Sequence, residues 1–410
     1  MNEQAILIGC QIQTEHDRMF QSSMDELRAL AFTVDAEILE TFTQKRDKVH
    51  SAYYVGTGKV EEIKYYIQEN EVDVAIINNE LTPSQSRNLS NTLDVKIIDR
   101  TQLILDIFAM RARTKEGKLQ VELAQLEYML PRLHGKGVEL SRLGGGIGTR
   151  GPGETKLETD RRHIRNRITD IKAQLKQVAK HRNQYRENRK RRSAFQISIV
   201  GYTNAGKSTL FNRLTQETSL EEDKLFATLD PLTRRLTLPS GFQALLSDTV
   251  GFIQKLPTTL IAAFRSTLEE VTEADFILHV VDCSDPQAIE HEKTVKELLN
   301  ELEADHLPIL TVYNKIDLLK DEFIPYSQPS ISITAKDESH LKQLLLKIED
   351  VLKHEWKSYN LALQSDQGKV LNELKHESIV SSYTFDEEQE VYHVEGYIDQ
   401  EKPLYNQLIK

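Results

Sequence analysis

A glycine-rich loop that ends in lysine and serine lies halfway along the chain, in GYTNAGKS (Gly201–Ser208). It follows a predicted strand, FQISIV, and precedes a helical stretch, TLFNRLTQ, which is the context that the phosphate-binding GxxxxGK[ST] motif requires. Backbone N–H groups of such a loop bind phosphate oxygens, its lysine reaches the β- and γ-phosphates, and its serine hydroxyl ligates Mg²⁺. We therefore expect a nucleotide to contact Gly201, Tyr202, Thr203, Asn204, Ala205, Gly206, Lys207, Ser208 and Thr209.

A second motif, DTVG (Asp248–Gly251), ends a later apolar strand, FQALLSD. Asp248 can hold Mg²⁺ through a water molecule, and the Gly251 N–H can bind the γ-phosphate; Thr249 and Val250 complete the expected contact loop. The next residue is Phe252, at the position where many GTPases carry the glutamine that orients the attacking water. Since a hydrophobic side chain cannot orient water, we expect intrinsic hydrolysis to be slow.

Two loops further along the chain, NKID (Asn314–Asp317) and TAK (Thr334–Lys336), predict guanine specificity. The Asp317 carboxylate can accept hydrogen bonds from the N1–H and the 2-amino group of guanine; adenine lacks that pair, so the site would reject ATP. Asn314 would support the guanine edge, and Lys315 would lie along the base. The last loop is expected to place a backbone N–H, that of Ala335, on the guanine O6, and its residues complete the contact set: Thr334, Ala335 and Lys336.

A threonine between the first two motifs should sense the γ-phosphate and Mg²⁺. The segment LFATLDPLTRR (Leu225–Arg235) contains two, and we assign the role to Thr228, with Thr233 as the alternative. Phe226 and Ala227 precede Thr228 and are expected to contact the nucleotide. The expected Mg²⁺ ligands are then Ser208, Thr228 and Asp248, and the expected catalytic groups are Lys207, Thr228 and Gly251.

Two helices with matching apolar stripes precede these motifs. Leucines recur at positions 119, 123, 126 and 130, and apolar residues recur at positions 157, 164, 168, 171, 175 and 178. The segment that joins them, SRLGGGIGTRGPGE (Ser141–Glu154), contains six glycines. This pattern predicts an antiparallel helical hairpin with a glycine-rich tip, limited by Pro131 and Pro152. Its second helix would run from about Lys156 to Arg192, or about 55 Å.

The hairpin region is basic, although the chain as a whole has a formal net charge of −11. Residues 132–192 contain 18 Lys and Arg against 6 Asp and Glu. A local excess of this kind indicates an anionic partner, and glycine allows close backbone approach to it. A linker without fixed structure at the tip and a merely solvated basic helix face are the alternatives. The residues expected to contact RNA are Arg142, Gly144, Gly145, Gly146, Arg150, Lys156, Arg161, Arg162 and Arg165.

The expected fold class is α/β, in four parts. These are a small N-terminal α/β domain (1–98), the helical hairpin (99–193), a P-loop GTPase domain (194–356) and a small α+β C-terminal domain (357–410). In the first, VGTGKVEEIK (Val55–Lys64) could belong to a nucleotide site, but a lone GxGK is a weak signal and we favour a turn that opens a helix. Two distant cysteines, Cys10 and Cys283, argue against a zinc site. We expect neither a signal peptide nor a membrane span, and hence a cytoplasmic location.

The chain resembles the HflX family of ribosome-associated GTPases over nearly its whole length. The resemblance rests on GGGIGTRGPGETKLETDRRHIRNRI (Gly144–Ile168), GYTNAGKSTLFN, LFATLDPLTRR, DTVGFIQKLP and HVVDCSDP (His279–Pro286). Its most specific element is the glycine-rich run followed by ETKLETDRR. The last base loop has Thr334–Ala335 where the family commonly has Ser–Ala, so the alanine is retained.

The resemblance implies a protein that binds the 50S ribosomal subunit and its 23S rRNA in the GTP state, with the hairpin tip toward the peptidyl transferase centre. It implies the splitting of stalled or stress-inactivated 70S ribosomes and GTP hydrolysis, to GDP and phosphate, that the ribosome stimulates. We expect Mg²⁺ as cofactor and a monomeric protein. GTPases with a similar GxxNxGKS loop can ligate K⁺ through the asparagine in place of an arginine finger, which makes Asn204 a candidate K⁺ ligand.

Three other interpretations stay open. The protein could be an RNA-remodelling ATPase that uses a nucleotide site in its N-terminal domain, for which Val55–Lys64 is the only support. It could be a GTP-gated ribosome-binding module with negligible catalysis, an interpretation for which Phe252 leaves room. A membrane-associated GTPase is the third, and no amphipathic or lipid-anchor signal supports it.

Overall fold

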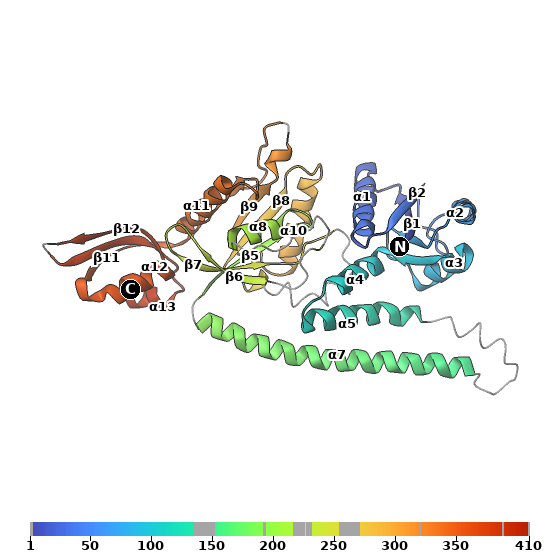
Figure 1. The fold of residues 1–410 in the computed structure, drawn as a ribbon, viewed down its shortest axis with the longest axis horizontal. Helices are drawn as coiled ribbons and strands as arrows, with labels where there is room; N and C mark the ends of the chain where they lie inside the picture. Colours follow the sequence, from blue (N-terminus) through green and yellow to red (C-terminus); the bar gives the residue numbers. More distant parts are fainter. Residues whose placement is uncertain are drawn as a thin grey trace. The chain divides into compact units, whose positions relative to one another are not determined.

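A computed structural model describes the chain as two compact units, whose elements are labelled in Figure 1. The first unit contains Met1–Ala179 together with the segment around Phe226, and the second contains most of the chain from residue 180 onward. The structure describes residues 3–133, 152–191, 194–215, 226, 232–253, 271–319, 321–387 and 389–408. Within these ranges the predicted α/β fold class is confirmed, with a GTPase sheet, a helical pair and a small C-terminal sheet.

A four-stranded parallel sheet forms the N-terminal part of the first unit, in the order β2-β1-β3-β4. Strands alternate with helices along the chain here, because each parallel pair needs a crossover connection. Val55–Lys64 leads into a helix, and Lys59 forms an ion pair with Glu62 (2.7 Å), which favours the turn-and-helix interpretation. The elements are β1 (Gln4–Ile12), α1 (Asp17–Thr33), β2 (Glu37–Arg46), α2 (Thr57–Glu69), β3 (Val74–Ile77), α3 (Pro83–Leu93), β4 (Lys96–Asp99) and α4 (Arg100–Arg111).

The predicted pair of helices is present as α5 (Lys115–Arg132) and α7 (Pro152–Arg191), which run in opposite directions in Figure 1. The apolar stripes meet as expected, with Leu119, Leu123 and Ile171 buried and Leu126, Ile168 and Leu175 packed around them. Ion pairs flank this core, between Arg167 and Glu122 (2.6 Å) and between Lys172 and Glu127 (2.8 Å). Pro131 lies inside the last turn of α5, so the helix continues one residue past the proline.

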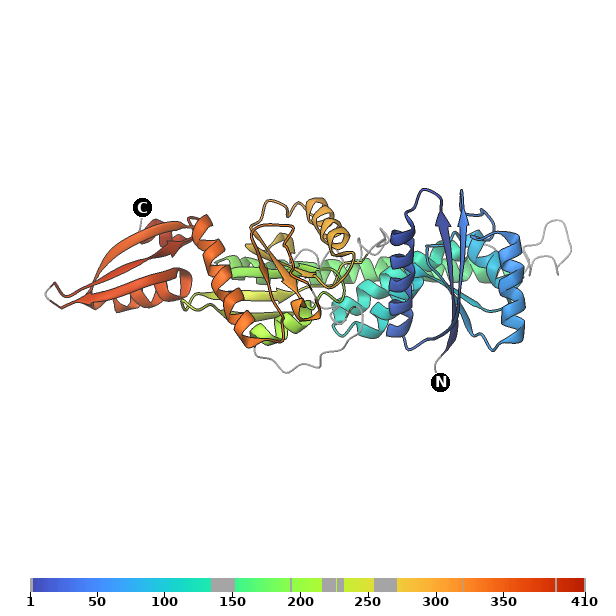
Figure 2. The same ribbon diagram turned by 90° about the horizontal axis from the view of Figure 1, so that it is seen from above.

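The second unit contains a six-stranded sheet in the order β10-β9-β8-β5-β7-β6, parallel except for β6, which is antiparallel to β7. Helices α8 and α11 cover one face and α10 covers the other (Figure 2), which explains why the central strands are continuously apolar. The carboxyl ends of β5, β7, β8 and β9 share one edge. The elements are β5 (Phe195–Gly201), α8 (Lys207–Thr215), β6 (Leu232–Thr237), β7 (Gln243–Asp248), β8 (Phe276–Asp282), α10 (Ala288–Glu301), β9 (Ile309–Asn314), a 3₁₀ turn (Ile316–Leu318), β10 (Ser330–Ser332) and α11 (Glu338–Glu355).

A small antiparallel sheet, β11-β13-β12, with two helices follows the GTPase sheet in the same unit. It joins the GTPase core where Trp356 packs edge-on against Phe195 and Phe242, with ring centroids 5.4 and 5.1 Å apart. None of the described helices combines the length and hydropathy needed to cross a bilayer. The elements are β11 (Lys357–Gln364), a 3₁₀ turn (Ser365–Gln367), α12 (Gly368–Glu377), β12 (Ile379–Asp386), β13 (Val391–Ile398) and α13 (Pro403–Leu408).

Candidate functional site

The predicted phosphate-binding loop connects the carboxyl end of β5 to the start of α8. Its curvature depends on glycine at two positions. A Cβ at Gly206, where φ is +92°, would approach Asn314 Nδ2 to 2.2 Å, and a Cβ at Gly201 would approach the Val280 carbonyl oxygen to 2.2 Å. A side chain at Gly201 would therefore displace the backbone of β8, and one at Gly206 would displace the side-chain amide of Asn314. Asn204 also has a left-handed backbone, with φ of +60°, which asparagine tolerates better than most residues.

Lys207 is buried at the start of α8, and its ammonium group donates a hydrogen bond to the Tyr202 carbonyl oxygen (2.6 Å). Burial lowers the pKa of Lys207 to about 8, while the nearby Asp248 carboxylate opposes that shift. Gly251 lies beside the ammonium group, since a Cβ at Gly251 would meet Lys207 Nζ at 2.9 Å. The structure thus brings two of the three predicted catalytic groups together. A bound phosphate would supply the counter-charge that a buried cation needs.

The Ser208 hydroxyl donates a hydrogen bond to Asp248 Oδ2 (3.0 Å), so two of the predicted Mg²⁺ ligands are adjacent. Thr249 anchors the next loop by donating to the Ile199 carbonyl oxygen (2.6 Å). A hydroxyl and a carboxylate oxygen at this spacing form a donor set that suits Mg²⁺, which prefers oxygen ligands. Thr228 and Ala227 lie outside the described residues.

Two other residues of the predicted switch segment to which a role was assigned, Phe226 and Thr233, are described. Phe226 is buried, and its ring packs against Phe108 of α4 with centroids 4.6 Å apart, so its side chain is engaged within the first unit. Thr233, the alternative switch threonine, lies on β6, with its hydroxyl 2.9 Å from Ser247 Oγ on β7.

Asn314 links the phosphate-binding loop to the last base loop. Its amide group donates to the Ala205 carbonyl oxygen (2.9 Å), and its Oδ1 accepts a hydrogen bond from the Ala335 N–H (2.9 Å). The N–H predicted to bind the guanine O6 is therefore bonded to Asn314 in this structure. Asp317 is exposed, and its carboxylate accepts a hydrogen bond from the Thr334 hydroxyl (2.9 Å), which holds it beside the same loop. Lys336, also exposed, contributes its carbonyl oxygen to Arg213 of α8 (2.8 Å).

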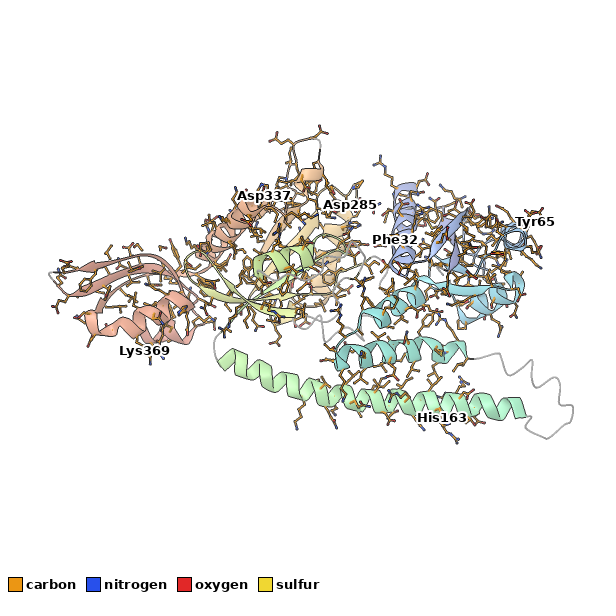
Figure 3. All side chains as sticks on the ribbon, in the orientation of Figure 1. Phe32, Tyr65, His163, Asp285, Asp337 and Lys369 are labelled. Atoms are coloured by element: carbon orange, nitrogen blue, oxygen red, sulfur yellow. The ribbon has the colours of Figure 1, made fainter. Side chains whose placement is uncertain are left out.

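Several contacts around these loops were not predicted from the sequence. Lys315, with φ of +67°, forms an ion pair with Asp282 at the end of β8 (2.7 Å). The buried Cys283 thiol donates to the Asn314 carbonyl oxygen (2.9 Å). The run DCSDP, directly after an apolar strand, is the sequence signal that could have placed Asp282 and Cys283 at this edge. Figure 3 labels Asp285 from the same run.

Phe252 points into the hydrophobic core, with Val200, Val271 and Val295 around it, and is 2% exposed. Its backbone pairs with the phosphate-binding loop. The Phe252 N–H donates to the Gly201 carbonyl oxygen (3.1 Å), and the Thr203 N–H donates to the Phe252 carbonyl oxygen (2.7 Å). The residue that replaces the usual glutamine thus fastens one loop to the other, and its side chain cannot reach an attacking water.

A small cavity lies between the phosphate-binding loop, the end of β8 and the start of α10. His279 lines it, is 1% exposed, and has no hydrogen-bond partner for either ring nitrogen among the described residues. Burial lowers the pKa of His279 to about 4, so the ring is neutral near pH 7. Two further lining residues, Tyr202 and His291, stack on each other with ring centroids 3.7 Å apart. In the described part of the chain, no group of three or more His, Cys, Asp or Glu is arranged to hold a metal ion.

The predicted RNA-binding residues are described only in part. Arg162 and Arg165 are exposed on α7, as is His163, which Figure 3 labels, and Arg161 is partly buried. Only the backbone of Lys156 is described. The remaining members lie outside the described residues: Arg142, Gly144, Gly145, Gly146 and Arg150.

The chain is similar to known GTPases over nearly its whole length. Family models match it as "GTP-binding GTPase N-terminal" over residues 21–109, "GTP-binding GTPase Middle Region" over 111–189 and "50S ribosome-binding GTPase" over 196–315. It is 55% identical over 407 residues to GTPase HflX of Alkalihalophilus pseudofirmus, covering 99% of this chain and 96% of that protein. It is 42% identical over 375 residues to GTPase HflX of Escherichia coli, covering 90% and 87%.

A solved structure, the complex of SsGBP with GDP, aligns with a TM-score of 0.50 at 26% identity, covering 85% of this chain and 98% of that chain. Three observations agree with one another: the identity of 55% over nearly the full chain, the three family models that match successive parts of the chain, and the geometry of the loops at the sheet edge. The protein is a GTPase, and the chain belongs to the HflX family.

Proposed function

We propose that this GTPase binds the 50S subunit and, in its GTP state, splits stalled or stress-inactivated 70S ribosomes. The observation that carries the proposal is one chain that combines a nucleotide site at the β5–β7–β9 edge with a helix, α7, whose exposed charged side chains are more often basic than acidic. Relatives named GTPase HflX and the match to a 50S ribosome-binding GTPase model support it. Of the four predicted parts, the hairpin (99–193) would contact rRNA and the GTPase domain (194–356) would sense the nucleotide. The N-terminal domain (1–98) precedes the hairpin, and the C-terminal domain (357–410) would be an accessory domain.

In the nucleotide site, Lys207 would neutralise the β- and γ-phosphates, and the Gly251 N–H would bind the γ-phosphate. Ser208 and Asp248, already adjacent, would hold Mg²⁺, with Thr228 as the third ligand on the switch segment. Mg²⁺ would neutralise charge on the phosphates. Asp317 would select guanine, since its exposed carboxylate is free of the buried contacts that engage Asn314.

Water positioning must come from outside the Phe252 side chain, because that side chain is buried in the core. We propose that the ribosome supplies this positioning, and that a K⁺ ion held by Asn204 adds positive charge near the phosphates. Asn204 is exposed at the rim of the phosphate-binding loop, which leaves its amide oxygen accessible to an ion.

The hairpin would dock on 23S rRNA through Arg162, Arg165 and the glycine-rich tip. Because α7 ends at Arg191 and β5 begins at Phe195, only a short connection separates the rRNA-binding helix from the nucleotide sheet. A change at the nucleotide loops can therefore be passed to α7 through β5, whose other end carries Gly201.

The first experiment measures GTP hydrolysis by the purified chain, alone and with 50S subunits, in K⁺ and in Na⁺ buffer, with Lys207→Ala as the inactive control. We expect strong stimulation by 50S and faster turnover in K⁺. Tight GTP binding without stimulation would instead favour the GTP-gated binding module, an alternative to which the burial of Phe252 gives specific support. Equal rates of GTP hydrolysis in K⁺ and Na⁺ buffer would refute the proposal that Asn204 binds K⁺.

Splitting is measured by the loss of 70S light scattering with GTP, compared with GDP. For the rRNA contact, Arg162→Gln with Arg165→Gln should weaken 50S binding and reduce the slope of log K against log salt by about 1 to 2. An unchanged slope would rule out phosphate contacts by these two side chains.

A further inference from the structure

Two aromatic side chains on β12, Tyr383 and Phe385, are exposed on the helix-covered face of the C-terminal sheet. Tyr383 is opposite Val394 and Phe385 is opposite Tyr392 in the β12–β13 register, so both rings lie on the face that packs under α12 and α13. Nevertheless Tyr383 is 53% exposed and Phe385 is 43% exposed. Neither belongs to the buried cluster of this domain. We call this pair the aromatic edge.

The aromatic edge is held in place by its neighbours. Phe385 packs against Tyr392 with ring centroids 4.6 Å apart, and the Lys375 ammonium group lies 3.8 Å from the Tyr383 ring centroid. The other face of the strand is polar, where Ser382 donates to the Glu395 carboxylate (3.3 Å). Because the rings are positioned before any partner arrives, binding would cost little side-chain entropy.

The strand that carries the aromatic edge is also open along its backbone. Among the described strands, β12 pairs with β13 on one side and with none on the other. An edge strand of this kind can accept an extended segment of another chain, with main-chain hydrogen bonds for affinity and side-chain contacts for specificity. The β12–β13 hairpin also reaches past the ends of α12 and α13 in both ribbon views (Figures 1 and 2).

Charge decides which class of partner fits. Residues 357–410 contain five lysines and no arginine, against ten Asp and Glu. Four of these carboxylates follow Phe385 within five residues of the sequence: Asp386, Glu387, Glu388 and Glu390. An acidic surface repels rRNA, and exposed tyrosine and phenylalanine rings bind the cationic side chains of lysine and arginine.

We propose that the aromatic edge binds a basic, extended segment of a protein of the large ribosomal subunit. The inference rests on the proposed binding to 50S. It gives the two ends of the chain opposite tasks, with the basic hairpin on RNA and the acidic C-terminal domain on protein.

The test places a benzophenone photocrosslinking amino acid at position 383 of the full-length chain and irradiates the GTP-bound complex with 50S. Position 384, on the opposite face of β12 and also exposed to solvent, is the matched control. We expect a protein-linked product from position 383 that resists ribonuclease and is several times more abundant than that from position 384. A crosslink to rRNA, or none from a chain that co-sediments with 50S, overturns the proposal. A chain that does not co-sediment refutes the proposed 50S binding itself, so the two failures are distinguishable.

A second measurement keeps the inference independent of the photochemistry. Replacing both rings, Tyr383→Ser with Phe385→Ser, should weaken the Kd for 50S about tenfold or more, because exposed aromatic residues at interface centres contribute strongly to binding. Thr384→Ser is the control and should leave the Kd unchanged. Far-UV circular dichroism and the GTPase rate without ribosomes should be the same in all three proteins, which shows that both the C-terminal sheet and the GTPase domain remain folded. An unchanged Kd for the double variant overturns the proposal.

Discussion

Replacing Asn314 by alanine should uncouple the phosphate-binding loop from the guanine-binding loop. In the structure this buried side chain makes two hydrogen bonds of 2.9 Å, to the Ala205 carbonyl oxygen and from the Ala335 N–H. The Asn314→Ala change removes both and leaves two buried backbone groups without partners. Each such group costs about 1 to 3 kcal/mol, and partial access of water reduces that cost, so we expect a loss of about 2 to 4 kcal/mol in the free energy of unfolding.

The chain offers a direct probe for this loss. Trp356, the only tryptophan, packs against Phe195 and Phe242 of the GTPase core, so its fluorescence reports the unfolding of that part in urea. With a denaturant dependence of about 3 kcal/mol per molar, the Asn314→Ala midpoint should fall by about 1 M. The affinity for GDP should fall at least about tenfold as well, because both loops that flank the base lose their tie.

A matched control separates burial from hydrogen-bond length. Thr334→Val removes a hydrogen bond to Asp317 of the same 2.9 Å length, but the Asp317 carboxylate is exposed. Water can replace that bond, so the urea midpoint should shift by less than about 0.3 M. If Asn314→Ala shifts the midpoint no more than Thr334→Val does, the reasoning about the buried tie is refuted.

Three further predictions concern specificity, catalysis and pH. Asp317→Asn should weaken GDP binding about 100-fold or more and improve binding of xanthosine diphosphate, whose 2-carbonyl oxygen can accept a hydrogen bond from the new amide. Competition with fluorescent nucleotides measures both affinities. A preserved preference for GDP would contradict the assignment of Asp317. Phe252→Gln should not raise basal GTP hydrolysis but should lower the free energy of unfolding by about 3 kcal/mol, because the side chain lies in the core; a faster enzyme would show that the position faces the nucleotide. Burial lowers the pKa of His279 to about 4, below the value of about 6.5 in the unfolded chain, so the unfolded state binds more protons between these values and stability falls as the pH drops. The free energy of unfolding of the wild type should therefore fall by about 2 kcal/mol between pH 7 and pH 5 because of His279. In urea titrations at the two pH values, the fall for His279→Leu should be smaller by about 2 kcal/mol. An identical pH dependence in the two proteins would disprove this role of His279.

The amino-acid sequence by itself determined the kind of nucleotide site and the order of its parts. GYTNAGKS, DTVG and NKID are local motifs, in which glycine positions and polar residue types already imply a backbone conformation at a strand end. The helical pair was equally predictable, since the spacing of Leu119, Leu123 and Ile171 specifies one face of each helix.

Only the tertiary structure decided where side chains point once the strands are assembled. The strand order β10-β9-β8-β5-β7-β6 is not the order in the chain, so nothing local shows that Asn314 reaches Ala205 or that Lys315 meets Asp282. The direction of Phe252 follows from pairing with the phosphate-binding loop, a contact made by backbone groups that every residue type possesses.

The C-terminal sheet shows the same limit. Alternation in β12 assigns Tyr383 and Phe385 to one face, which a sequence pattern can predict. Whether helices cover that face depends on the lengths and packing of α12 and α13, and these leave both rings exposed. Burial is a property of the assembled domain, because it depends on atoms from segments distant in the chain, and so it cannot be obtained from any one stretch of sequence.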